Sequence, residues 1–269
     1  MVAESQRDRV ATLPVRVVAS LVRRADTSQR IRKHLDALLT LPDVTSTILH
    51  RVSATTIRAP ERIGDVAPPG FGQADTFDDV TWLFSSNYAN RGVSQLMLDE
   101  AAWLFRRIQS YPGCTVAEVG RCKGGTTVLL AAAGAHVVSL DNGQYEQGLL
   151  RRGQGDTRPG TFLMSLEETL TGLGLSARVE LIEADAMTFP LGGKTFDWVY
   201  LDIPLPVTGC QQLFDHWWPA VETGGALIIR DGAEPRTPGP LTVAKRLADR
   251  PDVKLDPSPP GRFVVAYRT

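Results

Sequence analysis

Short apolar segments alternate with helical patterns from residue 94 to the end of the chain. The apolar segments are rich in Val, Ile and Leu, which is typical of strands buried on both faces. They are TVAEVG (115–120), HVVSLD (136–141), RVELIEAD (178–185), FDWVYLD (196–202) and ALIIRD (226–231). The helical patterns lie at 94–108, 125–133, 162–173, 209–221 and 242–249, with Ser94 or a neighbour as a plausible cap. This alternation predicts right-handed crossovers and a mostly parallel sheet.

The two ends of the chain add to this core. Two strand-like runs, DVKLD (252–256) and RFVVAYR (262–268), close the chain after the last helix and predict an antiparallel edge hairpin. The expected fold is therefore α/β: a Rossmann-like, doubly wound, mostly parallel seven-stranded sheet with an antiparallel C-terminal edge hairpin. Residues 1–75 are predicted to form an N-terminal helical extension that ends in a Pro- and Gly-rich linker and serves as a lid or in dimerisation. Residues 76–269 form the predicted sheet domain.

A glycine-rich turn after the 115–120 strand predicts a ligand site. Glu118 and Gly120 end the strand, the loop runs to Gly125 at the start of a helix, and Asp141 ends the next strand. Glycines let a ligand approach the backbone, the helix start offers unpaired N–H groups, and an acid at a strand tip can hold ribose hydroxyls. The GxxxGG spacing differs from the dinucleotide GxGxxG, and Glu118 favours a ligand ammonium group over a pyrophosphate.

With these residues the sequence resembles the class I S-adenosylmethionine-dependent methyltransferases over about residues 94–269. The matching runs are E-V-G-R-C-K-G-G-T-T (118–127), S-L-D-N (139–142), E-A-D-A (183–186), Y-L-D (200–202) and G-G-A-L-I-I-R-D (224–231). The chain looks most similar to bacterial small-molecule O-methyltransferases, which include sugar and natural-product enzymes. A bacterial source also agrees with the small number of lysines, five among 29 basic residues.

The resemblance implies a role for acids at four successive strand ends. Glu118 would lie near the amino-acid end of S-adenosylmethionine, Asp141 would bind its ribose, and Asp185 would accept from its adenine. Asp202 would face the methyl donor and the substrate as the catalytic residue. The implied cofactor-binding residues are Glu118, Gly120, Gly124, Thr126, Asp141, Asn142, Asp185 and Ala186.

A metal requirement is left open by the sequence. Related metal-dependent families place acids at the ends of the fourth and fifth strands, where this chain has Asp202 and Asp231, and such carboxylates would suit Mg²⁺. The histidine that many relatives carry after the fourth strand is absent, and Gly232 follows Asp231. A third ligand would have to be Glu234 or a residue of the N-terminal extension. The alternative for Asp231 is a loop carboxylate paired with Arg230 or another base.

The expected function is methyl transfer to a small-molecule acceptor, most simply the hydroxyl of a sugar or secondary metabolite. An N-methyltransferase and a catalytically inactive cofactor-binding protein remain alternatives. A nucleic-acid methyltransferase is disfavoured by the net charge of −1 and by the absence of a D/N-P-P-aromatic motif at Asp202. A nicotinamide-dependent oxidoreductase is disfavoured by the glycine spacing.

Other features allow only looser expectations. Three cysteines make no disulfide framework, which favours a cytoplasmic protein, and Cys122 is expected to be a packed rather than a reactive thiol. No membrane association is expected, whereas a homodimer remains open. His216, in FDHWWPA, is expected to pack a helix on the sheet. The aromatic segment 81–95 could border the substrate or only pack, and the loop 153–160 could be a lid or a plain connection.

Overall fold

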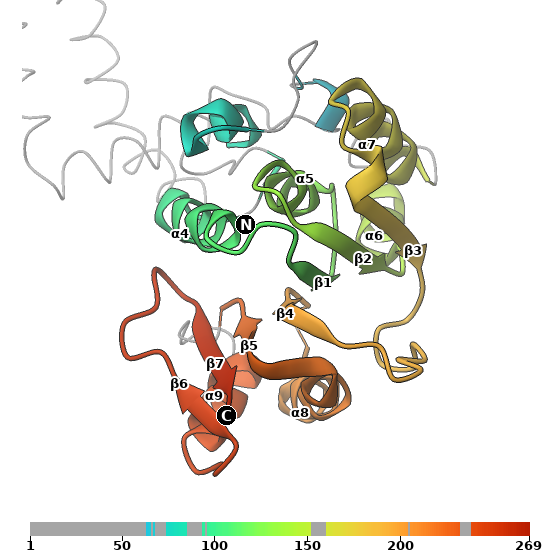
Figure 1. Ribbon diagram of the computed structural model, residues 1–269. Coiled ribbons are helices and arrows are strands. Elements are labelled where there is room, and N and C mark those ends of the chain that lie inside the picture. Colours follow the sequence, from blue (N-terminus) through green and yellow to red (C-terminus); the bar gives the residue numbers. More distant parts are fainter. Residues whose placement is uncertain are drawn as a thin grey trace, which may run out of the picture. The chain divides into compact units, whose positions relative to one another are not determined.

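The computed structural model describes residues 63–65, 67, 74–84, 93–94, 96–151, 160–203, 205–231 and 238–269, apart from the side chains of residues 149 and 150. They all belong to one compact unit, which comprises Pro60–Phe84 and Gly92–Thr269 (Figure 1). Its helices are η1 (Ile63–Asp65), η2 (Phe77–Leu83), α4 (Leu98–Gln109), α5 (Gly125–Ala132), α6 (Gln144–Arg151), α7 (Thr161–Gly172), η3 (Ser176–Arg178), α8 (Val207–Trp217), η4 (Trp218–Ala220) and α9 (Pro238–Leu247). Its strands are β1 (Thr115–Val119), β2 (His136–Asp141), β3 (Val179–Glu183), β4 (Phe196–Leu201), β5 (Val221–Ile229), β6 (Val253–Leu255) and β7 (Val264–Arg268).

The strands form one seven-stranded sheet in the order β3-β2-β1-β4-β5-β7-β6. Neighbours from β3 through to β5 pair in parallel, whereas β7 runs antiparallel to both β5 and β6. The predicted mostly parallel sheet with an antiparallel C-terminal edge is therefore confirmed. Because the strand order reverses between β1 and β4, the carboxyl ends of these two strands lie at the switch point where doubly wound folds bind ligands.

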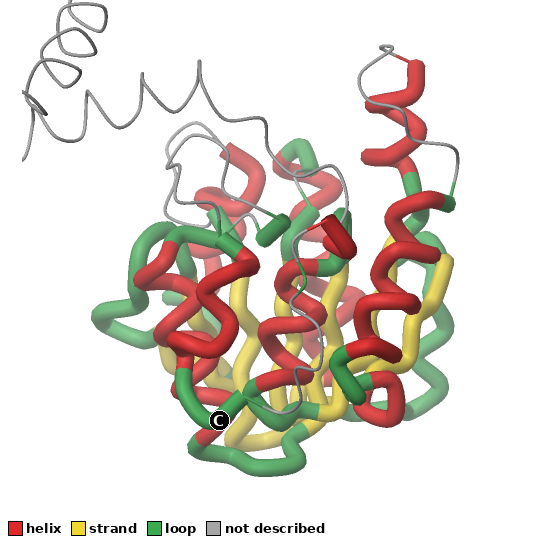
Figure 2. Tube along the Cα trace, turned by 90° about the horizontal axis from the view of Figure 1, so that it is seen from above, coloured by secondary structure: helices red, strands yellow, loops and turns green. Residues whose placement is uncertain are grey.

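Each face of the sheet buries its own apolar core. Val116 of β1 and Tyr200 of β4 face a cluster that contains residues of η2, α4, α5 and α7. Val119 of β1 and Leu201 of β4 face the second cluster, which contains residues of α8 and α9. Successive residues of one strand thus enter opposite cores, as the two-residue period of a strand requires. Figure 2 shows the helices running alongside the strands.

Several element boundaries differ from those predicted. The first core helix begins at Leu98 rather than near Ser94, because the Glu100 carboxylate accepts the N–H of Met97 (2.9 Å) and so caps the helix at Met97. Strand β5 begins at Val221, five residues before the predicted start of 226. Helix α6 lies in a stretch for which the sequence predicted no helix.

Part of the predicted linker, residues 59–75, packs against the sheet unit. Ile63 is buried in the first core, and the Gly64 N–H donates to Ser165 Oγ of α7 at 3.1 Å. The Ala74 N–H donates to the Ala132 carbonyl of α5 at 3.2 Å. Several stretches for which the sequence allowed expectations lie outside the described residues. They are residues 1–62, residues 85–92 and 95 of the aromatic segment, and the loop 152–159. The predicted lid or dimerisation role of residues 1–75 therefore stays a prediction.

Among the described residues, no helix combines the length and apolar character needed to cross a membrane.

Candidate functional site

Glu118 is a buried carboxylic acid at the carboxyl end of β1. Its Oε2 accepts hydrogen bonds from Thr127 Oγ1 of α5 (2.5 Å) and Ser139 Oγ of β2 (2.6 Å). Within the described part of the chain Oε1 has no hydrogen-bond partner. Burial raises the pKa of Glu118 to about 7, although both hydroxyls and Arg121 act to lower it. A positive group that approached this end of β1 would therefore be attracted by the carboxylate and would favour its ionised form.

The Glu118 partner on α5 is Thr127. The cofactor-binding role expected of the neighbouring Thr126 stays a prediction. Gly124 caps α5 in the left-handed region at φ 86°, and Thr127 comes three residues later. That position on the first turn brings the Thr127 hydroxyl to Glu118, while Thr126 is buried beside it. Sequence reasoning missed Thr127 and Ser139, although a hydroxyl beside a strand-end acid was a usable signal.

Asp141, at the end of β2, organises the glycine-rich loop. Its Oδ2 accepts the N–H groups of Arg121 (3.0 Å) and Cys122 (2.8 Å), and its Oδ1 accepts the Gly143 N–H (2.7 Å). Cys122 is held at φ 52°, in the left-handed region. The carboxylate therefore supports the loop directly. Its remaining lone pair could accept a further hydrogen bond from a ligand.

Glycines of this loop are required by the chain's own packing. A Cβ on Gly120, which has φ +98°, would lie 2.4 Å from the Asp202 carbonyl oxygen, and one on Gly125 would lie 2.4 Å from Ser94 N. A Cβ on Gly124 would meet the end of the Leu166 side chain of α7 at 2.5 Å. Gly120 thus brings the ends of β1 and β4 together, whereas the atoms over Gly124 belong to a side chain that can rotate.

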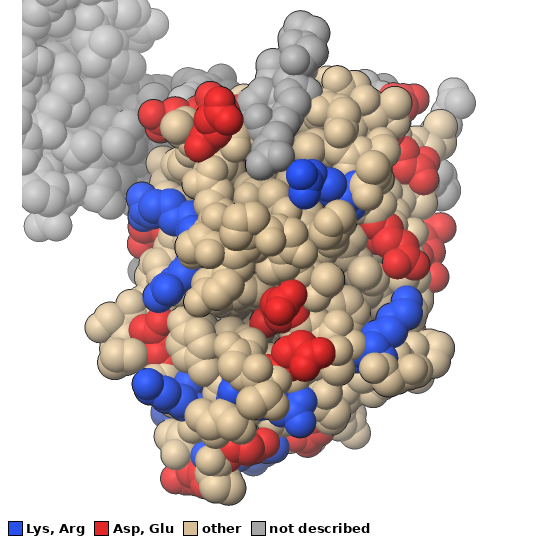
Figure 3. Space-filling model, viewed as in Figure 1, with Lys and Arg blue, Asp and Glu red and all other residues tan. Residues whose placement is uncertain are grey.

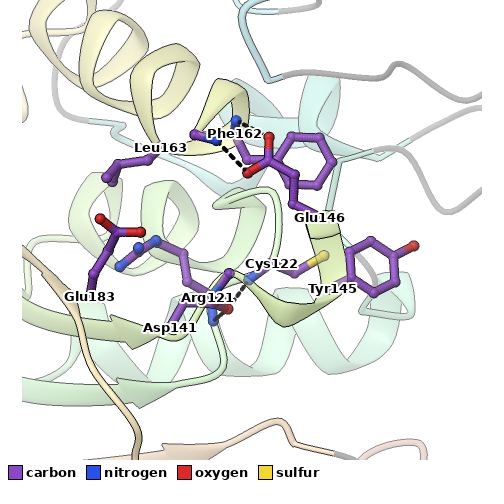
Figure 4. Close-up of a pocket in the computed structure, with 10 residues that line it drawn as sticks. Arg121, Cys122, Asp141, Tyr145, Glu146, Phe162, Leu163 and Glu183 are labelled. Atoms are coloured by element: carbon purple, nitrogen blue, oxygen red, sulfur yellow. Dashed lines mark hydrogen bonds between the residues drawn. The ribbon is translucent and has the colours of Figure 1, made fainter. Parts of the chain in front are cut away.

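A small pocket opens beside Asp141, between the glycine-rich loop and helices α6 and α7 (Figure 4). Figure 4 shows Arg121 and Glu183 extending to one side of it, and Tyr145 and Phe162 lying on the other. Its lining residues are Arg121, Cys122, Asp141, Gly143, Tyr145, Glu146, Gly160, Phe162, Leu163 and Glu183. Of the residues predicted to bind a cofactor, Asp141 lines this pocket.

Helix α6 supplies much of that pocket, and sequence reasoning missed it. Glu146 is buried, and its carboxylate accepts the N–H groups of Gly160 and Phe162, both at 3.0 Å, at the start of α7. The Arg121 guanidinium donates to the carbonyls of Ser139 (2.7 Å) and Ile182 (3.3 Å), and so joins the loop to the ends of β2 and β3.

Three more predicted residues lie next to this region. Asn142 is exposed, and its Oδ1 accepts the Gln144 N–H at the start of α6 (3.1 Å). Asp185 is exposed after β3, and its Oδ1 accepts the Met187 N–H (2.9 Å). Ala186 is buried, and its carbonyl accepts from the indole N–H of Trp217 at 3.0 Å. These contacts are local turns and packing, and the adenine role of Asp185 and Ala186 stays a prediction.

Asp202, directly after β4, lies against the glycine-rich loop. Its N–H donates to the Val119 carbonyl at 2.8 Å, and its carboxylate accepts from one guanidinium nitrogen of Arg230 at 2.7 and 3.0 Å. Burial alone would lower the pKa of the Arg230 guanidinium, but the charge of Asp202 raises it above its usual value. The structure therefore brings together Glu118, Gly120, Asp141 and Asp202, the acids and the glycine at the ends of the central strands.

Asp231, the second predicted metal ligand, is held by a different arginine. Its Oδ1 lies 2.8 Å from a guanidinium nitrogen of Arg262, in the loop before β7. Arg262 also donates its backbone N–H to the buried Glu100 of α4 at 2.8 Å. This pairing bears out the alternative that Asp231 pairs with a base, which is Arg262 rather than Arg230.

Among the described residues no group of three or more His, Cys, Asp and Glu side chains could hold a metal ion, so the predicted Mg²⁺ is not supported.

Other candidates from the sequence have structural contacts. His216 bonds to the Phe189 carbonyl at 2.9 Å and packs edge-on against Trp217, as expected for a packing residue. All three cysteines are unbridged thiols. Burial raises the pKa of Cys122 to about 12, so this thiol is not an activated nucleophile.

Comparison with known proteins identifies the fold. The sequence matches no protein-family model and no curated protein. Among solved structures, it is similar to a methyltransferase from Geobacter sulfurreducens, with a TM-score of 0.50 and 18% identity over 64% of this chain and 80% of that one. It is also similar to the O-methyltransferase from Bacillus cereus in complex with SAH, with a TM-score of 0.50 and 15% identity over 77% of this chain and 95% of that one. The chain has the Rossmann-like fold of class I methyltransferases, and the resemblance seen in the sequence is confirmed at the level of the fold.

Proposed function

We propose that this protein transfers a methyl group from S-adenosylmethionine to a small-molecule acceptor, most simply to a hydroxyl group. The observation that carries the proposal is the cluster at the switch point of the sheet. Three acids lie there at the ends of neighbouring strands of a methyltransferase fold. Glu118 is buried at the end of β1, Asp141 ends β2 and supports the glycine-rich loop, and Asp202 follows β4. The similar Bacillus cereus O-methyltransferase was solved in complex with SAH, the demethylated form of the cofactor.

The residues of this cluster fit the parts of S-adenosylmethionine. Glu118, with Oε1 outside any described hydrogen bond, suits the cofactor's ammonium group. Asp141, which lines the small pocket, suits the ribose, and Asp185 with Ala186 is proposed to border the adenine. When bound, the cofactor supplies an electrophilic methyl group on a sulfonium. The chain's own contribution is to align the acceptor with that methyl group and to exclude water.

Asp202 is proposed to face the acceptor. Both of its oxygens receive hydrogen bonds from Arg230, and Oδ2 also accepts from the Tyr200 hydroxyl at 3.4 Å. Oδ1 keeps capacity for a further bond. A hydroxyl of the acceptor that donated to Asp202 would be oriented by it. Asp202 is assigned this role by position, since it follows β4 directly and lies against Gly120.

A small acceptor is favoured over a nucleic acid. On the face shown in Figure 3, Lys and Arg side chains are scattered among Asp and Glu side chains rather than gathered into one basic surface. With a net charge of −1, this distribution offers little attraction to a phosphate backbone. Sugars and secondary metabolites are the acceptor classes that we propose to test first. We also propose that the enzyme acts in the cytoplasm.

The first experiment is calorimetric titration of S-adenosylmethionine into the wild type and into Asp141→Ala. The matched control is Glu180→Ala, which removes an exposed carboxylate from β3 outside the pocket. We expect saturable binding by the wild type and the control. Loss of the Asp141 hydrogen bonds should weaken it by roughly 10- to 100-fold. No binding by the wild type would refute the proposal.

Turnover is then measured as SAH release over a panel of acceptors with hydroxyl or amine groups. Release with hydroxyl acceptors supports O-methylation, whereas release with amines alone would replace it by N-methylation. Saturable cofactor binding without turnover over the whole panel would favour a binding protein that has lost the chemistry.

A further inference from the structure

Two ion pairs occupy the carboxyl ends of β4 and β5. Arg230 bonds Asp202 at 2.7 Å, with the side chains 6% and 20% exposed. Arg262 bonds Asp231 at 2.8 Å, with the side chains 16% and 21% exposed. The two acids are those at which related metal-dependent enzymes would place a divalent cation. Each acid therefore already has a positive group at hydrogen-bonding distance.

The donor set does not suit Mg²⁺. This ion takes octahedral oxygen ligands and is held in proteins by carboxylates whose charge is available to it. A metal bound to Asp202 and Asp231 would lie beside two partly buried guanidinium groups. Arg230 already binds the Asp202 oxygens, and Arg262 already binds Asp231 Oδ1. Like charges this close repel strongly where water is largely excluded. Binding would require both arginines to leave, and a buried arginine without its carboxylate is costly.

We propose that Arg230 takes the place of the divalent cation, so that methyl transfer by this protein needs no metal and Asp202 acts as a carboxylate oriented by an internal positive charge. The inference rests on the proposed function and deepens it, because it specifies the cofactor requirement of the same site. Arginine suits this role since it stays charged at all relevant pH values and its planar group holds a carboxylate in a defined orientation.

The second ion pair extends this arrangement to helix α4. Buried Glu100 accepts the backbone N–H of Arg262 at 2.8 Å, and its Oε1 lies 3.7 Å from Arg262 Nε. A Cβ on Gly261 would lie 2.5 Å from Glu100 Oε1, so the loop before β7 packs closely on this carboxylate. Glu100 thus positions Arg262, which in turn holds Asp231. The carboxylate at the end of β5 is thereby tied into the structure by residues from two other elements.

The direct test is metal binding by the intact protein. Mn²⁺, a spectroscopic substitute for Mg²⁺, is mixed with the wild type at equimolar concentration, with and without SAH, and the EPR signal of free Mn²⁺ is recorded. We expect the signal to equal that in buffer alone. The proposal would be overturned if the wild type removed the free Mn²⁺ signal stoichiometrically and Asp202→Asn did not. Loss that persists in the Asp202→Asn, Asp231→Asn double variant would place the metal elsewhere, and these two carboxylates would remain metal-free as proposed.

A second test measures the ion pair itself. Arg230→Met removes the charge but keeps much of the side-chain volume, and should lower the melting temperature by roughly 5–10 °C, because Asp202 is left unpaired. Adding Asp202→Asn to Arg230→Met should restore much of that loss, since the carboxylate that had lost Arg230 is then neutral. Equal melting temperatures for the wild type and Arg230→Met would overturn the proposal. If Arg230→Met does not fold, Arg230→Lys, which keeps the charge, should fold and still exclude Mn²⁺.

The methyltransferase function and the metal-free site can be tested separately. Calorimetry with SAH on the same wild-type sample reports cofactor binding without any acceptor. Absence of SAH binding would refute the methyltransferase function, while the Mn²⁺ and melting experiments would still report on the ion pairs. Binding of SAH together with stoichiometric Mn²⁺ binding at Asp202 would keep the function and refute the metal-free site.

Discussion

Replacement of Glu118 by Gln should change how the stability of this protein depends on pH. The carboxyl group is fully buried, and its pKa in the folded state is about 7 against an ordinary value of 4.5. Gln has the same shape and can still accept from the Thr127 and Ser139 hydroxyls, which lie 2.5 and 2.6 Å from Glu118 Oε2. The substitution therefore removes the ionisation and keeps the hydrogen bonds.

The sign of the effect follows from which state holds the proton. Between pH 4.5 and about 7 the unfolded chain has lost the Glu118 proton, whereas the folded chain retains it. The folded state is therefore favoured at low pH, and this contribution falls by about 1.4 kcal/mol for each pH unit across that window. Above about pH 7 the carboxyl is ionised in both states and the loss is complete. The difference between the two pKa values corresponds to about 3 kcal/mol.

The assay is urea unfolding at a series of pH values from 4.5 to 8, followed by tryptophan fluorescence. Relative to the wild type, Glu118→Gln should be equally stable at the acid end and about 3 kcal/mol more stable at pH 8. Glu180→Gln, which changes an exposed acid, should run parallel to the wild type. Parallel curves for Glu118→Gln as well would refute the reasoning, since they would mean that burial does not perturb this carboxyl.

The same group links stability to the proposed cofactor. An ammonium group beside Glu118 would favour its ionised form, so binding below pH 7 should release a proton. Calorimetry at pH 6 in buffers of different ionisation enthalpy would detect that proton. Glu118→Gln should bind S-adenosylmethionine more weakly and without this release. Release of the same proton by the variant would assign it to another group.

Three further predictions follow from the packing of the unit. Gly120→Ala would place a Cβ 2.4 Å from a backbone carbonyl and should cost several kcal/mol of stability in urea unfolding, whereas Gly174→Ala, also at positive φ but in open space, should cost only about 1 kcal/mol. Glu100→Ala should cost about 3 kcal/mol in the same assay, because it removes both the helix cap at Met97 and the acceptor of the Arg262 backbone N–H; a cost below 1 kcal/mol would contradict that role. Cys122 should react with a thiol reagent far more slowly in the native protein than in urea, and equal rates would show an accessible, activated thiol.

Much of the sheet could be predicted because its signals are local. The apolar runs 136–141 and 196–202 coincide with β2 and β4 to within one residue, since residues buried on both faces leave a continuous apolar pattern in the chain. Acids at the ends of such runs then predict that Glu118, Asp141, Asp185 and Asp202 converge, because parallel strands end at one edge. The structure brings Glu118, Asp141 and Asp202 together around the glycine-rich loop, whereas Asp185 is exposed in the turn after β3.

Helix α6 could not be predicted in the same way. Its sequence, QYEQGLLR, contains an internal glycine, which disfavours a helix. The helix is supported from outside, through the contact of Glu146 with the start of α7. Which hydroxyl of α5 contacts Glu118 was not predicted either, because it depends on the left-handed residue Gly124 that sets where α5 begins.

By itself the sequence determined the alternation of strands and helices, the glycine-rich turn, and the acids at the strand ends, because each is encoded by residues a few positions apart. Only the tertiary structure decided which charges pair. Asp202 is bound by Arg230, 28 residues away, and Asp231 by Arg262 of the loop before β7. Such pairs depend on the order of strands and on the packing of loops at the sheet's edge, which no local pattern records. For that reason the sequence could not decide whether a metal ion binds at Asp202 and Asp231. In the folded chain, arginines pair with both carboxylates.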